Sequence, residues 1–261
     1  MRAFLLPAVI FVATMISAGA SAQSSSGLEI SSNGKLRVAS FTNNILFMKK
    51  PDGRIVGAAV DLGNFIARKL GVTFEPVVYA NPELYTSSFG TGAWDIAIGP
   101  RTGATAEKSD FGPDFILVDN IYLAVPGREF TDATQVDRVG VRIGVAQNGP
   151  PDLLLTRTLK SAQLVRVPGG VPDVIELLRS GKADVFASNG EIIHAAANGL
   201  PGSKIVPGAF NTVRMAVALP KGRSAAAQAM LAAIVNEAKG TGIARKAIEQ
   251  YQLKGVRAAQ D

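Results

Sequence analysis

Short apolar runs alternate with amphipathic segments in the first third of the chain. Between residues 61 and 70 the apolar side chains recur at the helical period, at Leu62, Phe65, Ile66 and Leu70. Gly71 is placed to end that helix. The pattern predicts strands over 35–40, 72–78 and 94–98, helices over 61–70 and 83–89, and a turn at 51–53 with a return strand at 55–57. This β-α-β-α-β order predicts a parallel sheet with helices on its faces.

The same rhythm returns in a second block. It predicts strands over 142–146, 164–167 and 183–187, and helices over 151–159, 172–180 and 190–198. Two long apolar stretches, 115–125 and 212–219, bracket this block, and helices over 224–239 and 243–251 follow. We therefore expect an α/β protein of two lobes, each with a parallel-type sheet and flanking helices, joined by two hinge strands.

Lobe 1 is expected to contain residues 35–120 and 215–261, and lobe 2 residues 121–214 with the hinge strands. The crevice between two such lobes is a natural ligand site, which bending of the strands would open and close. One continuous doubly wound domain is the alternative that the pattern leaves open.

The first residues indicate export. A positive charge at Arg2 precedes an apolar run over 3–19, and Ala20-Ser21-Ala22 has the small residues that a signal peptidase needs. We expect a signal peptide over 1–22, a flexible lead over 23–34 and a mature protein in the periplasm. A membrane anchor is the weaker interpretation, because the strongly apolar core over 4–16 is shorter than the ~20 residues that span a bilayer.

Composition removes several kinds of chemistry. The chain has no Cys and one His, which excludes disulfides, cysteine nucleophiles and cysteine-based metal centres, and leaves little for acid–base work. The net charge is +6, from 27 Lys and Arg against 21 Asp and Glu, but the basic residues are scattered and there is one Trp. We expect no nucleic-acid partner, metal or cofactor. His194 is expected to be structural.

Several segments, in order and at matching spacing, resemble extracellular solute-binding protein family 3, the amino-acid-binding components of ABC transporters. The segments that carry the resemblance are Leu36-Arg37-Val38, 51–57, Val60-Asp61-Leu62, 66–72, Trp94-Asp95-Ile96-Ala97, Ser109-Asp110-Phe111 with Pro113, 139–145 with Gly149, and 177–184. Together they cover residues 35 to 253. The resemblance implies a type II periplasmic-binding-protein fold and a monomeric, non-enzymatic receptor. That receptor would close on a small polar solute and deliver it to an inner-membrane ABC permease.

Two charged positions of the family pattern are missing. Where the family has an arginine for the ligand carboxylate, this chain has Thr105, and Arg101 is the nearby alternative. Where the family has an acidic residue for the ligand amine, this chain has Asn189, with Glu191 two residues later. Arg101 is equally consistent with a solvated loop charge, and Glu191 with an ordinary first-turn residue of a helix.

The remaining candidates come from loops. The family's first-loop aromatic is Asn44 here, whereas Phe47 keeps a later aromatic position and Phe41 is a second local candidate; core packing is the alternative for each Phe. Backbone N–H groups at Asn148-Gly149, before a helix, suit an anionic oxygen. The full set of expected ligand-binding residues is Phe41, Asn44, Phe47, Arg101, Thr102, Thr105, Asn148, Gly149 and Asn189.

Two other functions stay open at this point. An exported dehydratase-like enzyme on the same scaffold would need a general acid, and Glu191, Glu107 and Asp114 are the available donors. A periplasmic accessory protein without a transported ligand is the other, because the two charged clamp positions are lost. The sequence identifies neither the solute nor the permease.

Overall fold

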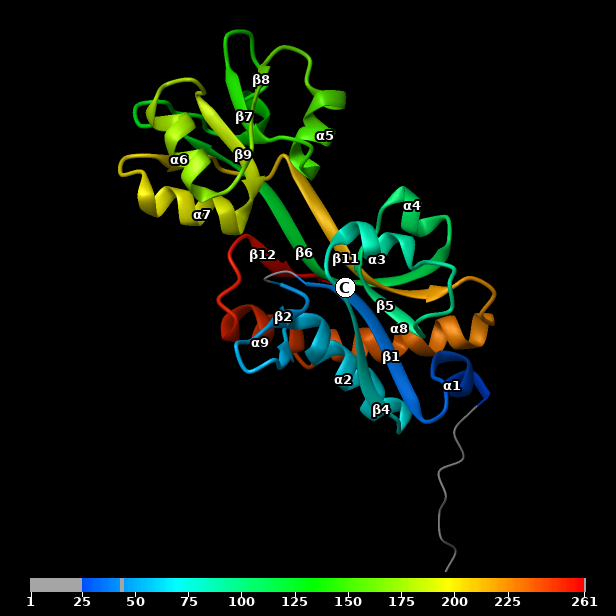
Figure 1. Cartoon of the computed structure of the whole chain (residues 1–261). Helices are drawn as coiled ribbons and strands as arrows, with labels where there is room; N and C mark the ends of the chain where they lie inside the picture. Colours follow the sequence, from blue (N-terminus) through cyan, green and yellow to red (C-terminus); the bar gives the residue numbers. More distant parts are fainter. Residues whose placement is uncertain (1–24, 43–44, 261) are drawn as a thin grey trace, which may run out of the picture.

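The described residues of this computed structural model, 25–42 and 45–260, form two lobes joined by long strands (Figure 1). The predicted signal peptide over 1–22 and the candidate Asn44 lie outside the described residues. One hydrogen-bonded sheet runs through both lobes in the order β4-β1-β5-β11-β6-β9-β7-β8, with β10 and β12 also paired to β6. We expected two separate sheets. They are continuous because the hinge strands pair with each other and with both lobes.

Lobe 1 is built mainly from the first block of the sequence. Its central strand β1 pairs in parallel with β4 and β5, and a small hairpin of β2 and β3 precedes the first long helix. Gly71 adopts the left-handed conformation and ends that helix, as the sequence predicts. The elements are β1 (Lys35–Phe41), β2 (Met48–Lys49), β3 (Ile55–Val56), α2 (Ala58–Leu70), β4 (Thr73–Tyr79), α3 (Pro82–Ser87), β5 (Ile96–Pro100) and α4 (Gly103–Ala106).

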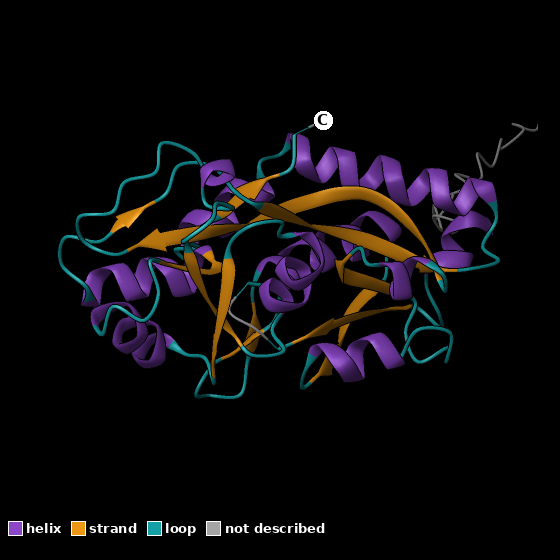
Figure 2. Cartoon of the chain, turned by 90° about the horizontal axis from the view of Figure 1, so that it is seen from above, coloured by secondary structure: helices purple, strands orange, loops and turns teal. Residues whose placement is uncertain are grey.

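Lobe 2 repeats this arrangement. Its central strand β7 pairs in parallel with β8 and β9, so the order β8-β7-β9 matches β4-β1-β5. Helices cover both sides of its strands (Figure 2) and enclose two apolar clusters, one on each face. The elements are the 3-10 helix η1 (Ala133–Gln135), β7 (Arg142–Ala146), α5 (Pro150–Thr158), β8 (Gln163–Val167), α6 (Val171–Arg179), β9 (Val185–Asn189), α7 (Gly190–Gly199) and β10 (Lys204–Ile205).

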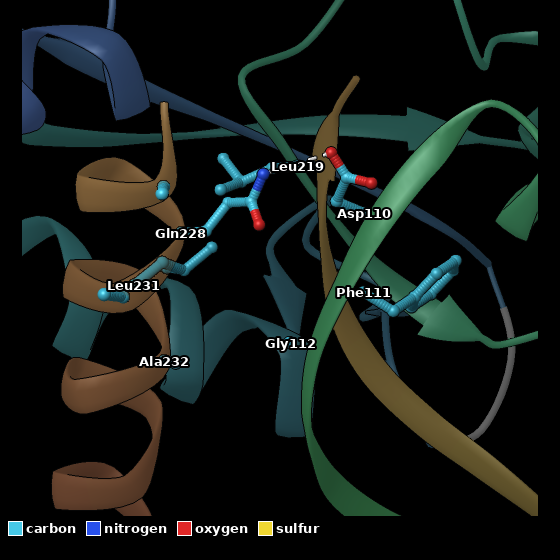
Figure 3. A pocket seen from close by; sticks show the side chains of 9 residues that line it. Asp110, Phe111, Gly112, Leu219, Gln228, Leu231 and Ala232 are labelled. Atoms are coloured by element: carbon cyan, nitrogen blue, oxygen red, sulfur yellow. Dashed lines mark hydrogen bonds between the residues drawn. The ribbon is translucent and has the colours of Figure 1, made fainter. Parts of the chain in front are cut away.

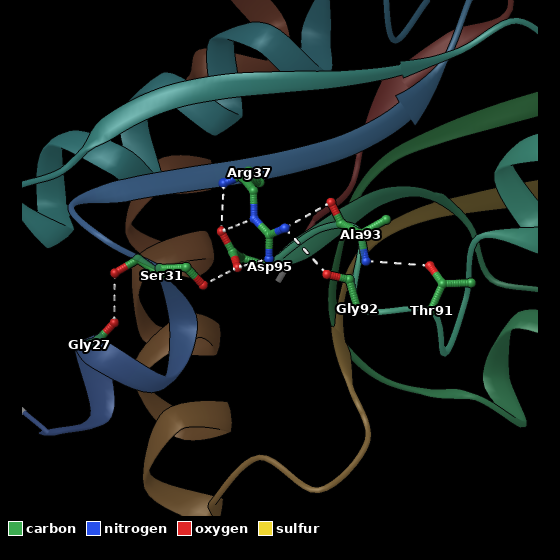
Figure 4. Close-up of polar contacts among 8 residues, drawn as sticks. Gly27, Ser31, Arg37, Thr91, Gly92, Ala93 and Asp95 are labelled. Carbon is green, nitrogen blue, oxygen red and sulfur yellow. Dashed lines mark hydrogen bonds and ion pairs between the residues drawn. The ribbon is translucent and has the colours of Figure 1, made fainter.

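The two lobes share a polar contact, made by the aspartate that comes just before β5 in lobe 1 and just before β9 in lobe 2. Asp95, just before β5, accepts hydrogen bonds from the backbone N of Arg37 at 2.8 Å and from its guanidinium at 2.8 and 3.2 Å (Figure 4). Asp184, just before β9, accepts them from the backbone N of Arg142 at 2.9 Å and from its guanidinium at 3.1 Å. One buried carboxylate thus joins β1 to β5 in lobe 1, and another joins β7 to β9 in lobe 2.

The crossing between the lobes contains β6 (Ser109–Ala124) and β11 (Asn211–Pro220), which are antiparallel. These are the two hinge strands that the sequence predicts. The chain then returns to lobe 1 through α8 (Ala225–Gly240) and α9 (Ile243–Gln250), and ends with β12 (Val256–Ala258), which pairs with β6 at the crossing. β12 is a third strand at the hinge, and the sequence pattern did not predict it.

The segment expected as a flexible lead, 23–34, instead contains α1 (Ser25–Ile30), so that prediction is wrong for its described part. Ile30 is fully buried in the lobe 1 core. The carboxylate of Glu29 accepts hydrogen bonds of 2.8 Å from both the backbone N and the hydroxyl of Ser224, the residue that caps α8. Helix α1 is therefore held by contacts to Ser224, which lies 195 positions later in the chain.

Candidate functional site

The carboxyl ends of the parallel strands in both lobes meet the crossing strands. Pro100, at the end of β5, lies opposite Met215 of β11, and Asn189, at the end of β9, lies opposite Asn120 of β6. Asn120 in turn faces Asn211, which is four residues from Met215. The ends of β5 and β9 are therefore four residues apart along the strands, which is about 13 Å at about 3.3 Å per residue. Across the sheet they are separated by three strand spacings, about 14 Å. Crevices at such strand ends are the usual ligand sites of α/β sheets.

The aromatic candidates of lobe 1 pack inward. The ring of Phe41 lies 5.3 Å from that of Tyr85, and Phe41 is 7% exposed at the end of β1. Phe47 is fully buried in the lobe 1 core. In this arrangement Phe47 packs in the core, which was the alternative that the sequence left open, and a ligand contact there stays a prediction.

Arg101 follows β5 directly and is partly exposed. Its guanidinium lies 5.3 Å from the ring centre of Phe111 and donates a 2.7 Å hydrogen bond to the carbonyl of Gly112. It also lies 3.4 Å from Asp114, whose other oxygen accepts a 2.6 Å hydrogen bond from Arg214 of β11. Two arginines thus share one carboxylate beside the end of β5, and the cluster has one positive charge in excess.

Thr102 and Thr105 cap the short helix α4. The hydroxyl of Thr102 accepts from the backbone N of Thr105, and the hydroxyl of Thr105 accepts from the backbone N of Thr102 at 3.1 Å. Thr105 is buried, and its hydroxyl also lies 3.3 Å from the carbonyl of Pro100. The side chain of Thr105 is thus enclosed and hydrogen-bonded within the loop, and a ligand contact there stays a prediction. Thr102 remains exposed.

The lobe 2 candidates Asn148 and Gly149 form the turn into α5. Asn148 has a positive φ of 59°, and its backbone N donates a 2.9 Å hydrogen bond to Asp152. Asp152 is buried and also accepts two 3.0 Å hydrogen bonds from Arg166. A cavity of about 330 Å³ lies beside this ion pair, lined by Asn148, Asp152, Leu153, Thr156, Arg157 and Arg166. The backbone N of Gly149 donates a 3.0 Å hydrogen bond to the carbonyl of Ala146, so both N–H groups expected to receive an anion are already occupied.

Asn189 is the N-cap of α7. Its side-chain oxygen accepts a 3.1 Å hydrogen bond from the backbone N of Ile192, while its backbone belongs to the β6–β9 ladder. Glu191 lies in the first turn of α7, where a carboxylate is favoured. Glu191 also lines a cavity of about 120 Å³ between elements of the two lobes. The lining residues are Ile45, Met48, Glu191, Tyr251, Gln252, Leu253, Lys254 and Val256.

Sequence reasoning missed two polar groups near the end of β5. Arg214 is the one charged residue of the crossing strand β11, which was a usable signal. The hydroxyl of Tyr85 is buried without a hydrogen-bond partner among the described residues, and burial raises the pKa of this phenol. A Cβ built at Gly99 of β5 would lie 2.5 Å from that hydroxyl, so glycine there admits the tyrosine to the strand.

A separate cavity of about 330 Å³ lies on lobe 1 between the start of β6 and α8 (Figure 3). Asp110 and Gln228 face each other across it, with Asp110 accepting a 3.3 Å hydrogen bond. This cavity includes none of the expected ligand residues. Among the described residues, no group of His, Asp and Glu side chains is arranged to hold a metal ion, and no helix has the length and apolar character of a membrane span.

No family model matches the sequence, and no curated protein matches it. Solved structures do. An ancestral cationic amino acid solute binding protein is 20% identical with a TM-score of 0.64, and the match covers 87% of this chain and 99% of that one. The amino acid ABC transporter substrate-binding protein AbpA from Streptococcus pneumoniae, bound to L-arginine, is 22% identical with a TM-score of 0.59 and coverages of 84% and 94%.

An ancestral cyclohexadienyl dehydratase is 24% identical with a TM-score of 0.55, and the match covers 84% of this chain and 93% of that one. At this level of identity the similarities establish the fold alone. The chain therefore has the two-lobed fold of periplasmic solute-binding proteins, as its sequence resemblance implied, and that fold supports both binding proteins and an enzyme.

Proposed function

We propose that this chain is the substrate-binding component of an ABC importer, which encloses a small polar solute by closing its two lobes. One observation carries the proposal: the lobes have matching strand orders, and one strand of each lobe ends against the crossing pair, β5 against β11 and β9 against β6. Those ends are about 20 Å apart, from the strand spacings. A solute of amino-acid size would contact both lobes only after they had moved closer together.

The solute class follows from the charges at the strand ends. We infer that the solute carries a carboxylate, because Arg101 and Arg214 share the single carboxylate of Asp114. Arg101 would turn from the carbonyl of Gly112 to the ligand, since guanidinium pairs well with carboxylate. Asn189 offers no charge for an ammonium group. An amino acid or a related carboxylate with a weaker amine contact suits this site.

Export supports the same proposal. Residues 1–22 have the sequence of a cleavable signal, which would place the mature chain in the periplasm. There we expect a monomer that delivers its solute to an inner-membrane permease, with no nucleic-acid partner and no cofactor.

The proposal is tested by thermal shift and calorimetry on the purified mature chain, with a panel of amino acids, opines, amines and small carboxylates. We expect one class of carboxylate-bearing solute to raise the melting temperature by several degrees and to be recovered unchanged. No stabilisation by any member of a wide panel would contradict the proposal and favour an accessory protein without a transported ligand.

A dehydratase is the second candidate, because one structural neighbour is an ancestral cyclohexadienyl dehydratase. Of its possible acids, Asp114 already contacts two arginines, while Glu107 follows α4 and Glu191 lies in the first turn of α7. Mass spectrometry of the incubated solute distinguishes the two functions. A dehydrated product that forms with the protein, and not with a Glu191→Gln or Glu107→Gln variant, would replace the receptor by the enzyme.

A further inference from the structure

The last strand of the chain occupies a distinctive place at the hinge. Along one edge of β6, residues Ile116–Val118 pair with β12, and Asn120–Ala124 pair with β9 of lobe 2. Between these two pairings, the backbone N of Asp119 donates a 2.8 Å hydrogen bond to the carbonyl of Gly255. Elements of the two lobes therefore meet end to end on this edge, at Asp119. Figure 1 shows β12 in red beside β6 and near α7.

The meeting point is a contact between two glycines. A Cβ built at Gly190, the first residue of α7, would lie 2.4 Å from the Cα of Gly255, and one built at Gly255 would lie 2.5 Å from the Cα of Gly190. Gly255 has a φ of +67°, which by itself favours glycine. Gly190 has no such need, because it begins a helix and its φ is not positive. The close approach of the two backbones is what requires glycine at Gly190.

Side chains fasten the same segment to the crossing. The carboxylate of Asp119 accepts hydrogen bonds from the guanidinium of Arg257 at 3.0 and 3.4 Å and from the hydroxyl of Thr212 at 2.6 Å. It therefore links β6, β11 and β12. Tyr251 anchors the other end of the segment, since its hydroxyl lies 3.4 Å from Asp61 of α2.

The segment also contacts the expected ligand loop. Ile45 and Met48, which flank Phe47, share the cavity of about 120 Å³ with Glu191 of α7 and with residues 251–254 and 256. The backbone carbonyl of Ile45 accepts a 3.0 Å hydrogen bond from Ala58 at the start of α2. The lobe 1 loop, the C-terminal segment and the first turn of α7 thus form one junction.

We propose that residues 251–258, the C-terminal brace, are the fulcrum on which lobe 2 turns, and that the contact between Gly190 and Gly255 sets the angle at which the lobes rest. The brace extends the function proposed above, because it is a part of the hinge closure by which the receptor would enclose its solute. The resting angle, however, is a property of the ligand-free protein and can be measured without a solute.

The absence of cysteine makes that measurement direct. Spin labels can be attached to cysteines introduced at Leu84 in lobe 1 and Val139 in lobe 2, which are 51% and 89% exposed. Double electron–electron resonance then measures the distance between the two labels. The test variant is Gly190→Ala. Its matched control is Gly103→Ala, because Gly103 also begins a helix behind a capping side chain and a Cβ there meets nothing within 4 Å.

A methyl group at Gly190 must move from 2.4 Å to about 3.8 Å from Gly255, so the junction must open by about 1.4 Å. We expect this displacement to grow with distance from the fulcrum, and to shift the mean distance between the labels by several ångströms. The Gly103→Ala control should give the unchanged distance. An unchanged distance in folded Gly190→Ala protein would overturn the proposal.

Arg257→Gln is a second variant, which tests the brace without adding volume at the junction. Loss of the ion pair with Asp119 should broaden the distance distribution, and a distribution as narrow as that of the unmodified protein would contradict the role of the brace. If no solute changes the distance between the labels in the unmodified protein or in the variants, the proposed receptor function is contradicted. The proposal for the brace is still tested by the ligand-free distances. If a solute shortens the distance but Gly190→Ala and Arg257→Gln leave the resting distance unchanged, only the brace fails.

Discussion

The side chains of Thr105 and Asn189 cap helices in this chain. Thr105 is enclosed in the capping box of α4, and the amide of Asn189 holds the first turn of α7. Both residue types are good partners for free backbone N–H groups. The two positions where the family that the sequence resembles has charge thus hold the local backbone in this chain, and under the proposed function Arg101 and Arg214 would contact a charged solute instead.

The first prediction concerns Arg101. If its guanidinium binds the solute carboxylate, Arg101→Ala should weaken binding by roughly 2–4 kcal/mol, because a charge-assisted pair is lost. The stability of the free protein should change little, since the side chain is 41% exposed. Titration calorimetry with the solute identified in the panel measures the affinity of the unmodified protein and of the variant. Arg68→Ala is the matched control, because Arg68 also lies over an aromatic ring, at 5.9 Å from that of Phe65. Equal affinity in the two variants would remove Arg101 from the site.

The second prediction concerns Asn189. Asn189→Asp keeps a good cap and adds a charge that the start of a helix favours, so the melting temperature should stay equal or rise slightly. The same charge should strengthen binding of solutes that carry an ammonium group, relative to carboxylates that lack one. Paired titrations with an amino acid and its deaminated analogue test this. A loss of stability, or no change in the ratio of the two affinities, would argue against Asn189 facing the solute.

At the scale of elements, the attachment of β9 to β7 depends on Asp184. Burial opposes ionisation of this carboxyl, but hydrogen bonds from Arg142 and Arg128 outweigh it and lower its pKa from 3.8 to about 2. The lowered pKa means that this contribution to stability is complete above pH ~4 and is lost as the pH falls toward 2. This contribution to the free energy of unfolding is roughly 2.5 kcal/mol, at about 1.4 kcal/mol per pKa unit.

The third prediction follows from this titration. Asp184→Asn should lower the free energy of unfolding at pH 7 by about 2 kcal/mol or more, because the backbone and guanidinium donors of Arg142 lose their charged partner. The gap between variant and unmodified protein should narrow between pH 4 and 2. Urea unfolding across this range measures it, with Glu83→Gln at an exposed position as control. A gap that stays constant down to pH 2 would show that Asp184 does not titrate as described.

Long periodic elements could be predicted from the sequence, whereas elements held by distant partners could not. The amphipathic pattern of α2 and the apolar runs of β6 and β11 identify themselves locally. Helix α1 is six residues long and is fixed by contacts between Glu29 and Ser224, 195 positions apart. Strand β12 is three residues long and pairs with β6 more than 130 positions before it. No local pattern contains such information.

The candidate site shows the same division. The sequence named Arg101 and Asn189 from their spacing within the family resemblance, and the structure places them at or just after the ends of β5 and β9. It could not tell that Phe47 is fully buried, or that Arg214 would share Asp114 with Arg101, because both depend on the pairing of strands far apart in sequence. Burial of an aromatic side chain and contact with a ligand leave the same pattern in a sequence.

The molecule as a whole is two copies of one arrangement facing each other across a hinge. In each lobe one buried carboxylate, Asp95 or Asp184, joins the central strand to the strand that follows that carboxylate. The crossing strands and the proposed C-terminal brace connect the two lobes.

The most direct test of this account is small-angle X-ray scattering of the mature protein, with and without each solute that raises its melting temperature. Closure of two lobes around a bound solute predicts a smaller radius of gyration, reached in proportion to the occupancy of a single site and reversed by dialysis. A solute that binds at full occupancy and leaves the radius of gyration unchanged would contradict the hinge-closing receptor.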